Sequence, residues 1–346
     1  MNVKFYLSET HACGHIRGEI PARALNANFN NIRVDCKTDV LCSDFFKTDL
    51  MVFQRSHQSD IFQKMLAAKS MGIKTVYEID DDMLNMPPEF EAPYQFYRKP
   101  EVRKIMQDFM CNVDAVTVST VALGESIRKR TPKPVFVVEN AIDLDRWRDA
   151  QLGGKVRLSA EALDNIVIGW MASGSHMIDV PLVDKALCDI LRAHPNVRVY
   201  IIGTLTLEHL AKYELARFSK QLIFSNWVEI NALPGVMAAF DIAIAPLVDI
   251  PFNRGKSGLK WMQHSALGIP GVYSDLPMYQ KLCTNDVDGF LVTPGQWHEP
   301  LEALVTDAEL RKRISIKCLQ NVQEWDINKT AGNWLQAWQR ILALCP

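Results

Sequence analysis

The chain has 346 residues, of which 48% are hydrophobic and 23% charged, and its formal net charge is -2. This length suits two domains, and the composition is that of an ordinary globular protein without long disordered segments. The near-neutral charge argues against tight binding of nucleic acid over the whole surface, although it does not exclude a local basic groove. Because no apolar stretch approaches the roughly 20 residues that cross a bilayer and no signal peptide precedes the first expected strand, we expect a cytoplasmic protein.

The eight cysteines are scattered along the chain, without a CxxC pair and without histidines at zinc-finger spacing. This usage is typical of reduced and mostly buried thiols in a cytoplasmic protein. We therefore expect no zinc site built on these cysteines.

Short apolar runs alternate with helical stretches along the whole chain. In the first half the runs occupy 3–7, 31–34, 49–53, 74–79, 114–119 and 134–138, and in the second half 165–171, 197–202, 221–225, 241–246, 270–274 and 289–292. Because the runs are continuous rather than alternating, we expect sheets that are covered on both faces, and because helices intervene, we expect mostly parallel strands. The sequence thus predicts a doubly wound α/β fold.

The strand pattern pauses over a polar stretch at 139–165 and then restarts. We interpret the pause as an interdomain connection, with one Rossmann-like domain at 1–150 and a second at 151–325. Apolar residues at three- and four-residue spacing in the last segment, 326–346, indicate an amphipathic packing helix. Ligands of open parallel sheets bind beyond the carboxyl ends of the strands, so two such sheets that face one cleft would suit a donor on one domain and an acceptor on the other.

The clearest candidate for chemistry is 241–275, which contains a buried strand, a polar loop and a helix. The segment Gly255-Lys256-Ser257-Gly258 opens that helix, where backbone N–H groups and the helix dipole favour an anion. Lys256 would add a positive charge and Ser257 a hydroxyl. A capped helix with a surface lysine is the alternative.

This segment resembles the donor-binding segment of retaining glycosyltransferases of the glycosyltransferase-B fold, close to the family-four group, also called group 1. Those proteins often have KxxExxAxGxP after the loop. The matching residues here are Lys260, Ala266, Gly268 and Pro270. The resemblance implies that Lys260 lies in a nucleotide-sugar site.

Two departures from the family pattern lie in the same segment. Gln263 stands where the family usually has the second glutamate of its E-x7-E motif, and Gly255 stands where it has the first. Gln263 can still hydrogen-bond the ribose hydroxyls, although it lacks the charge. Asn253, Lys256 and Ser257 are candidates for the work of the missing first glutamate.

The resemblance continues on both sides of this segment. Residues 168–179 look like the first strand of the family's donor domain and its small-residue loop, which would let backbone approach a pyrophosphate. The small residues are Ser173, Gly174 and Ser175. His176 and Asp179 follow at a helix start, where helix capping is an equal alternative. Residues 224–247 resemble the segment that usually contacts the base, with Val228 as a donor residue and Trp227 either at the base or in packing.

In the N-terminal half, Gly14 and Gly18 flank Arg17 directly after the first expected strand. Related glycosyltransferases often place a glycine-rich loop here against the donor phosphates or the acceptor, so Gly14 and Arg17 are candidates for donor binding. Arg17 could pair with a phosphate bidentately, or it could be a surface arginine at a helix start. After the third strand, Arg55 and His57 are candidates for the acceptor side.

Three aspartates, Asp80 to Asp82, follow the fourth expected strand. Related enzymes often carry a histidine–aspartate pair near this point in contact with the transferred sugar, so Asp80 and Asp81 are catalytic candidates beside Lys256. Helix capping or a solvated loop is the alternative. A metal site is expected at none of these positions, because successive strand residues point to opposite faces and the fold normally needs no metal.

The resemblance implies a hexosyl- or pentosyltransferase that moves a sugar, with retention, from a nucleotide sugar such as a UDP-sugar to an acceptor hydroxyl. The resemblance also implies that such an enzyme would need no cofactor and no metal. Lys256 and Ser257 would stabilise the leaving diphosphate by preorganised electrostatics. The acceptor could be a glycan, a small molecule or hydroxymethylated pyrimidine in DNA, since the compact build and the missing glutamates resemble divergent phage-borne enzymes that act in the host cytoplasm.

A DNA acceptor would need a basic cleft and a flipped base. The candidate cations are Arg17, Arg55, Lys99, Arg103, Lys104, Arg128, Lys129 and Arg130, for which a solvated face is the alternative. Two further alternatives stay open: a non-catalytic nucleotide-sugar-binding module, which the missing glutamates suggest, and a two-domain epimerase that acts on nucleotide sugars.

Overall fold

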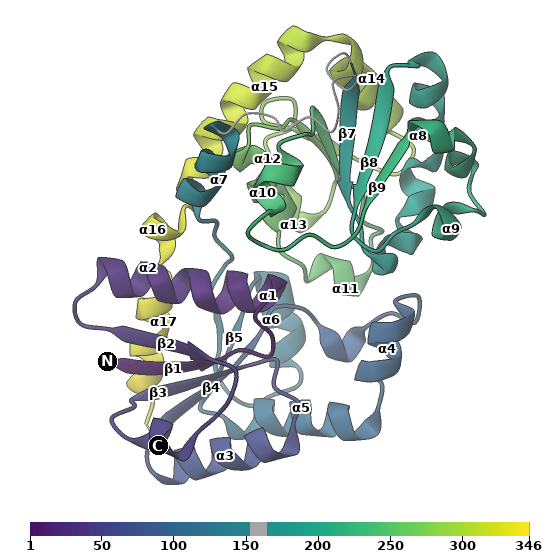
Figure 1. Ribbon diagram of the computed structural model, residues 1–346. Helices are drawn as coiled ribbons and strands as arrows, with labels where there is room; N and C mark the ends of the chain where they lie inside the picture. Colours follow the sequence, from purple (N-terminus) through teal and green to yellow (C-terminus); the bar gives the residue numbers. More distant parts are fainter. Residues whose placement is uncertain (153–164, 346) are drawn as a thin grey trace. The chain divides into compact units, whose positions relative to one another are not determined.

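The computed structural model describes residues 1–152 and 165–345, which divide into two compact units. Unit 1 comprises Met1–Asp143, Arg254–Ser257 and Trp325–Pro346, and unit 2 comprises Leu144–Asn253 and Gly258–Glu324. Each unit contains one six-stranded sheet with helices around it (Figure 1). The doubly wound α/β class expected from the sequence is therefore confirmed. Residues 153–164 of the expected interdomain connection lie outside the described residues.

The sheet of unit 1 is entirely parallel, in the order β2-β1-β3-β4-β5-β6. Its strands are β1 (Asn2–Tyr6), β2 (Arg33–Lys37), β3 (Leu50–Gln54), β4 (Lys74–Ile79), β5 (Ala115–Val118) and β6 (Val135–Val137). Every residue of β3 is buried, as the unbroken apolar run predicts for a strand with both faces covered. The chain order reverses at β1, which lies between β2 and β3, and such a switch point is where open parallel sheets bind ligands.

Helices cover both faces of this sheet, with α2 on one face and α3 and α5 on the other (Figure 1). The helices are α1 (Ala12–Gly14), α2 (Ile20–Asn28), α3 (Ser59–Ser70), α4 (Glu91–Tyr97), α5 (Pro100–Asn112) and α6 (Val121–Arg128), with a π-helix at His15–Glu19. Helix α5 begins with proline at its first position, where the missing N–H costs nothing. Its buried Phe109 stacks on Tyr77 of β4, with ring centroids 5.2 Å apart.

The end of the chain also belongs to unit 1. Helices α16 (Ile327–Thr330) and α17 (Gly332–Leu342) occupy the segment expected to be one packing helix. Trp334 and Trp338 of α17 are buried, and their rings lie 6.1 and 6.4 Å from that of Phe5 in β1. Because buried aromatic side chains contribute much apolar area, this helix completes the core beside the first strand.

Unit 2 repeats the architecture with the order β12-β11-β10-β7-β8-β9, again all parallel. The strands are β7 (Ile166–Met171), β8 (Val197–Ile202), β9 (Leu222–Ser225), β10 (Ile242–Ala245), β11 (Gly271–Ser274) and β12 (Phe290–Val292). The order reverses at β7, which pairs with β8 and β10. The loops after β7 and β10 therefore lie at the switch point of this sheet.

The helices between Leu144 and Asn321 surround the second sheet (Figure 1). They are α7 (Leu144–Leu152), α8 (Val180–Ala193), α9 (Leu207–Leu210), α10 (Leu233–Met237), α11 (Pro251–Arg254), α12 (Leu259–Ala266), α13 (Pro277–Gln280), α14 (His298–Thr306) and α15 (Ala308–Asn321). Helix α12 ends at Ala266, and Gly268 two residues later has a φ of 65°, in the left-handed region that glycine adopts without strain. This stop sends the chain directly into β11.

Candidate functional site

At the switch point of unit 2, Asp179 joins the loop after β7 to the loop after β10. Its side chain is 1% exposed. One carboxylate oxygen lies 2.8 Å from Nδ1 of His176, and the other accepts the backbone N–H of Val248 at 2.7 Å. A buried carboxylate is tolerable only with such partners. The pair noted from sequence is therefore a buried hydrogen-bonded pair.

Lys260, in the first turn of α12, completes this cluster. Its Nζ donates to the carbonyl oxygen of Met171 at 2.8 Å and lies 3.3 Å from Nε2 of His176. Because Nδ1 of His176 faces a carboxylate, the hydrogen-bond network assigns the proton to Nδ1 and the lone pair to Nε2. The ammonium of Lys260 thus contacts two neutral acceptors.

The other donor residues expected in unit 2 lie around this cluster or on neighbouring loops. Asn253 is fully buried and donates from Nδ2 to the carbonyl oxygen of Val248 at 2.9 Å, which holds the loop after β10 in place. Gln263 is 5% exposed, so most of its side chain is covered. Val228 is half-buried, whereas the adjacent Trp227 is 59% exposed.

The small-residue loop after β7 begins at Ser173, which is half-buried. Gly174 and Ser175 open a 3-10 helix that runs from Gly174 to Ile178. The side chain of Ser175 lies outside the described part of the structure. The loop follows a strand at the switch point, as a loop that approaches a phosphate must.

Arg254–Ser257 group with unit 1, although they directly precede α12 in sequence. There the hydroxyl of Ser257 accepts from Nδ2 of Asn140 at 2.7 Å. The ammonium of Lys256 lies 5.5 Å from the centroid of the Phe90 ring, within the range of a cation–π contact. Both side chains are half-buried.

At the switch point of unit 1, carboxylates surround Arg55. This residue follows β3 with a φ of 48°, an uncommon backbone conformation for a side chain of its size. Its Nε lies 2.9 Å from Asp80, and its Nη2 donates to Asp81 at 3.2 Å. Glu9 lies 3.8 Å from Nη1. Burial and the neighbouring Asp80 raise the pKa of Asp81 above its ordinary value, despite the attraction of Arg55.

His57 lies beside this cluster. Its Nδ1 lies 3.2 Å from the carbonyl oxygen of Arg55, and its ring meets that of Phe96 edge to face at 5.0 Å. The two residues expected on the acceptor side are therefore neighbours at the carboxyl end of β3, together with the two aspartates that follow β4.

Arg17 occupies a different environment from the one that we expected. Its side chain is 1% exposed, and its Nε donates to the fully buried Glu78 at 2.7 Å. Nη1 donates to the carbonyl oxygen of Val138 at 2.6 Å and to Oδ1 of Asn140 at 2.9 Å. The guanidinium also lies 4.6 Å from the centroid of the Trp334 ring. Arg17 is thus part of a buried network rather than a surface arginine, because Glu78 and α17 enclose it.

Gly14 shows why a glycine follows β1. A Cβ atom at this position would lie 1.7 Å from the carbonyl oxygen of Glu9, so no other residue fits without movement of the backbone. The loop is also held by Gln54, whose Nε2 donates to the carbonyl oxygen of Cys13 at 3.0 Å. Gly14 therefore shapes the loop that carries Glu9 to the Arg55 cluster.

Sequence reasoning did not assign a role to three residues of these clusters. Glu78 was visible only as one acid before the aspartates, and its partner Arg17 is 61 residues away in sequence. Glu9 gave no signal in the sequence. Asp179 did give one, because a histidine and an aspartate three residues apart at a helix start can form a local pair.

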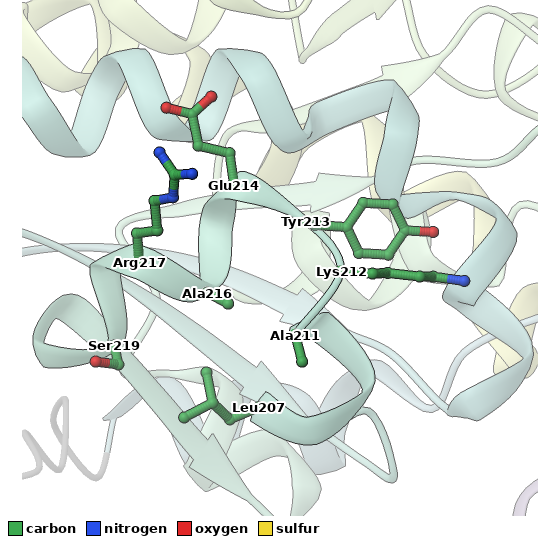
Figure 2. A pocket seen from close by; sticks show the side chains of 8 residues that line it. All are labelled: Leu207, Ala211, Lys212, Tyr213, Glu214, Ala216, Arg217 and Ser219. Carbon is green, nitrogen blue, oxygen red and sulfur yellow. The ribbon is translucent and has the colours of Figure 1, made fainter.

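A surface pocket of about 590 Å³ lies elsewhere on unit 2, along α9 and the 3-10 helix that follows it (Figure 2). Its lining residues are Leu207, Ala211, Lys212, Tyr213, Glu214, Ala216, Arg217 and Ser219. None of them is an expected site residue. The hydroxyl of Tyr213 donates to the carbonyl oxygen of Met177, so the wall of this pocket is connected to the loop after β7.

Among the residues that the structure describes, no group of three or more histidine, cysteine, aspartate or glutamate side chains could hold a metal ion. In the same part of the chain, every helix is too short or too polar to span a membrane. All eight cysteines are free thiols.

Residues 166–307 match the family model described as glycosyl transferases group 1. A search of curated proteins finds no match to this chain. The matched range, 166–307, includes β7, the loop after it, and α12.

Several solved structures are similar over nearly the whole chain. HepE of Anabaena, solved in complex with UDP-glucose, has 15% identity and a TM-score of 0.68, with 97% of this chain and 100% of that chain covered. The sucrose-phosphate synthase of Thermosynechococcus elongatus has 13% identity and a TM-score of 0.69, with 99% of each chain covered. A glycosyltransferase of Rickettsia africae has 13% identity and a TM-score of 0.64, again with 99% of each chain covered. These likenesses confirm the expected glycosyltransferase-B fold.

Proposed function

We propose that this chain, whose residues 166–307 match the group 1 glycosyl transferase model, is a glycosyltransferase that moves a hexosyl or pentosyl group from a UDP-sugar to an acceptor hydroxyl, with retention. The observation that carries the proposal is the coincidence of this domain with the Lys260 cluster at the switch point of unit 2. HepE of Anabaena, of the same fold, was solved with UDP and with UDP-glucose.

The donor diphosphate is assigned to the loop after β7 and to Lys260. Backbone N–H groups of Ser173, Gly174 and Ser175 would approach the phosphate oxygens, and Lys260 would supply the positive charge. Val228 lies on the loop assigned to the base. Asn253 and Gln263 support the site from within, because both are nearly or fully buried.

Lys256 and Ser257 are assigned to the charge that builds on the leaving diphosphate. Retention in this proposal needs no covalent intermediate with the protein, because preorganised cations and N–H groups stabilise the departing phosphate directly. Asp80 and Asp81 are assigned to the hydroxyls of the transferred sugar, with His57 and Arg55 on the acceptor side. Arg17 is assigned to a supporting role, since its Nε and Nη1 already serve Glu78, Val138 and Asn140.

A neutral acceptor, a glycan or a small polyol, fits the switch point of unit 1 better than DNA. Glu9, Asp80 and Asp81 surround the single guanidinium of Arg55, and such carboxylates accept hydrogen bonds from hydroxyls but repel phosphates.

Three of the cations proposed for a DNA groove pair with carboxylates. Arg17 pairs with Glu78, Lys104 pairs with Asp108 at 2.5 Å, and Arg130 lies 3.9 Å from Asp82. A DNA acceptor and a phage-type role therefore have less support than a neutral acceptor.

The test is binding and turnover with a panel of nucleotide sugars. We expect UDP and one UDP-sugar to raise the melting temperature, since a ligand at a hundredfold excess over its dissociation constant adds about 2.7 kcal/mol to apparent stability. That donor should then yield UDP in the presence of a neutral glycan or polyol and should retain its anomeric configuration in the product. ADP and GDP are the matched controls for the base.

Three outcomes would contradict parts of this proposal. Binding without any release of UDP would favour a non-catalytic module. Conversion of the donor without an acceptor would favour an epimerase. Transfer to hydroxymethylated DNA, but not to unmodified DNA or a glycan, would overturn the neutral acceptor.

A further inference from the structure

The cluster in unit 2 is a linear chain of hydrogen bonds that ends on Lys260. The backbone N–H of Val248 donates to Asp179, which accepts Nδ1–H of His176 through its other oxygen. Nε2 of His176 then faces the ammonium of Lys260 at 3.3 Å. Each link has one donor and one acceptor, so the direction of the whole chain is set by the buried carboxylate.

The direction of these hydrogen bonds matters because it presents an acceptor to Lys260. A lysine ammonium is a compact charge on a flexible side chain, so acceptors are needed to fix its position. A second acceptor, the carbonyl oxygen of Met171 at 2.8 Å, comes from the end of β7. Two acceptors from separate segments restrict where the charge can lie. A group that is fixed before the ligand arrives loses less freedom when it binds.

We propose that His176 and Asp179 are positioning residues that hold the ammonium of Lys260 where it binds the donor diphosphate. The inference rests on the proposed function, since it takes the diphosphate of a nucleotide sugar as the ligand. Asp179 fixes the tautomer of His176, and His176 presents Nε2 to Lys260. Neither residue needs to touch the donor.

The alternative is that His176 has a purely structural role, which would depend on its other ring nitrogen. In that case the bond from Nδ1 to Asp179 would matter, because it anchors the 3-10 helix of the loop, and Nε2 would be dispensable. The two nitrogen atoms can be tested separately, because the amide nitrogen of asparagine can replace Nδ1 and the amide oxygen of glutamine can replace Nε2.

The experiment compares His176→Asn with His176→Gln in the full-length chain, with the dissociation constant of UDP measured by calorimetry. Positioning predicts that His176→Asn weakens UDP about tenfold and leaves uridine unchanged, because uridine lacks the diphosphate. It also predicts that His176→Gln, which keeps an acceptor for Lys260 but loses the bond to Asp179, weakens UDP less than His176→Asn does, and that Lys260→Met loses at least as much affinity as His176→Asn. In turnover, the KM for the donor should rise more than kcat falls.

His194→Asn is the matched control. His194 also pairs with a carboxylate, with Nε2 2.9 Å from Glu302, but His194 caps the end of α8 and Glu302 lies on α14, away from the switch point. Its loss should leave the affinity for UDP unchanged.

The inference is overturned if His176→Asn binds UDP as tightly as the wild type, or if asparagine preserves binding and glutamine abolishes it. The wild-type protein supplies a test that does not depend on folding of a variant: the nitrogen chemical shifts of His176 should identify a neutral ring with its proton on Nδ1, and a proton on Nε2 would overturn the inference. Failure of the wild type itself to bind UDP or any nucleotide sugar would instead refute the proposed function.

Discussion

The two units place different charged groups at the switch points of their sheets. In unit 1 the switch point between β1 and β3 gathers Glu9, Asp80 and Asp81 around Arg55. In unit 2 the switch point between β7 and β10 holds Lys260 against the neutral acceptors of Met171 and His176. Two parallel sheets with different strand orders thus supply an edge suited to hydroxyl groups and an edge suited to a diphosphate. The difference lies in the side chains that follow each strand, as expected when function is carried by sites rather than by the fold.

One buried acid in each unit also has a different kind of partner. Glu78 in unit 1 neutralises the buried Arg17, whereas Asp179 in unit 2 accepts a backbone N–H and orients a histidine. A buried acid can therefore serve either a core ion pair or a site. Variants that remove one acid at a time separate these roles.

The largest expected effect is on the stability of unit 1. Glu78→Ala leaves the guanidinium of Arg17 buried without its carboxylate, which should lower the free energy of unfolding by about 3–5 kcal/mol. Denaturant unfolding measures this loss. Glu125→Ala, an exposed glutamate on α6, is the control and should change stability by no more than about 0.5 kcal/mol. A stable Glu78→Ala protein would show that the pair is not a core element and would break the comparison.

The next effect concerns turnover rather than folding. Asp81→Asn should lower kcat about a hundredfold, the scale seen when one preorganised polar contact is lost from a transition state. UDP affinity should hardly change, because the variant lies in unit 1 and the donor diphosphate is assigned to unit 2. Asp60→Asn, on the exposed start of α3, is the control. Equal losses of UDP affinity and kcat would contradict the division of labour between the two edges.

A third effect is a pH dependence located in unit 2. Burial, with a smaller contribution from Lys260, lowers the pKa of His264 from 6.5 to about 3. Between about pH 3 and pH 6.5, His264 is therefore protonated in the unfolded chain but neutral in the folded one. The stability that this difference contributes is fully present above about pH 6.5 and is lost as the pH falls. The loss from this group should reach about 1.4 kcal/mol per pH unit.

Unfolding curves between pH 4 and pH 8 test this dependence. His264→Gln should remove that contribution to the slope even if it lowers stability at pH 7, where the hydrogen bond between Nδ1 and the Tyr273 hydroxyl is lost. An unchanged slope in His264→Gln would mean that other groups in unit 2 carry the pH dependence.

The smallest effect distinguishes base contact from packing at Trp227. This side chain is largely exposed, so little core packing is lost in Trp227→Ala. If the indole stacks on the base, UDP affinity should fall by about 1 kcal/mol, or roughly fivefold, at the low end of base–aromatic stacking. Leu207→Ala, another exposed apolar residue of unit 2, is the control. Unchanged affinity would place the base elsewhere on the unit.

Several features of the fold and the site were visible in the local sequence. The unbroken apolar run of β3 predicted a strand covered on both faces, and the structure buries every residue of it. Arg55 and Asp80 could each be placed directly after a strand from the sequence. Parallel strands bring their carboxyl ends together, so residues remote in sequence become neighbours there.

Other features depended on partners that the local sequence does not identify. Arg17 after β1 has the same local signature whether it binds a phosphate at the surface or a buried glutamate. The amphipathic pattern of α17 likewise predicts a buried face without saying which unit covers it. In the structure, its tryptophans lie against Phe5 of unit 1.

Local pattern was therefore sufficient for the strands, the parallel sheets and the strand ends that carry polar residues. The hydrophobic pattern that marks a strand or helix extends over only a few consecutive residues, and a turn can depend on a single residue such as Gly268. The partner of Arg17, the place of α17 and the link from Asp179 to Val248 arose from packing between segments far apart in the chain. A buried charge or an apolar face requires some partner, but the three-dimensional arrangement of the elements selects which one it meets.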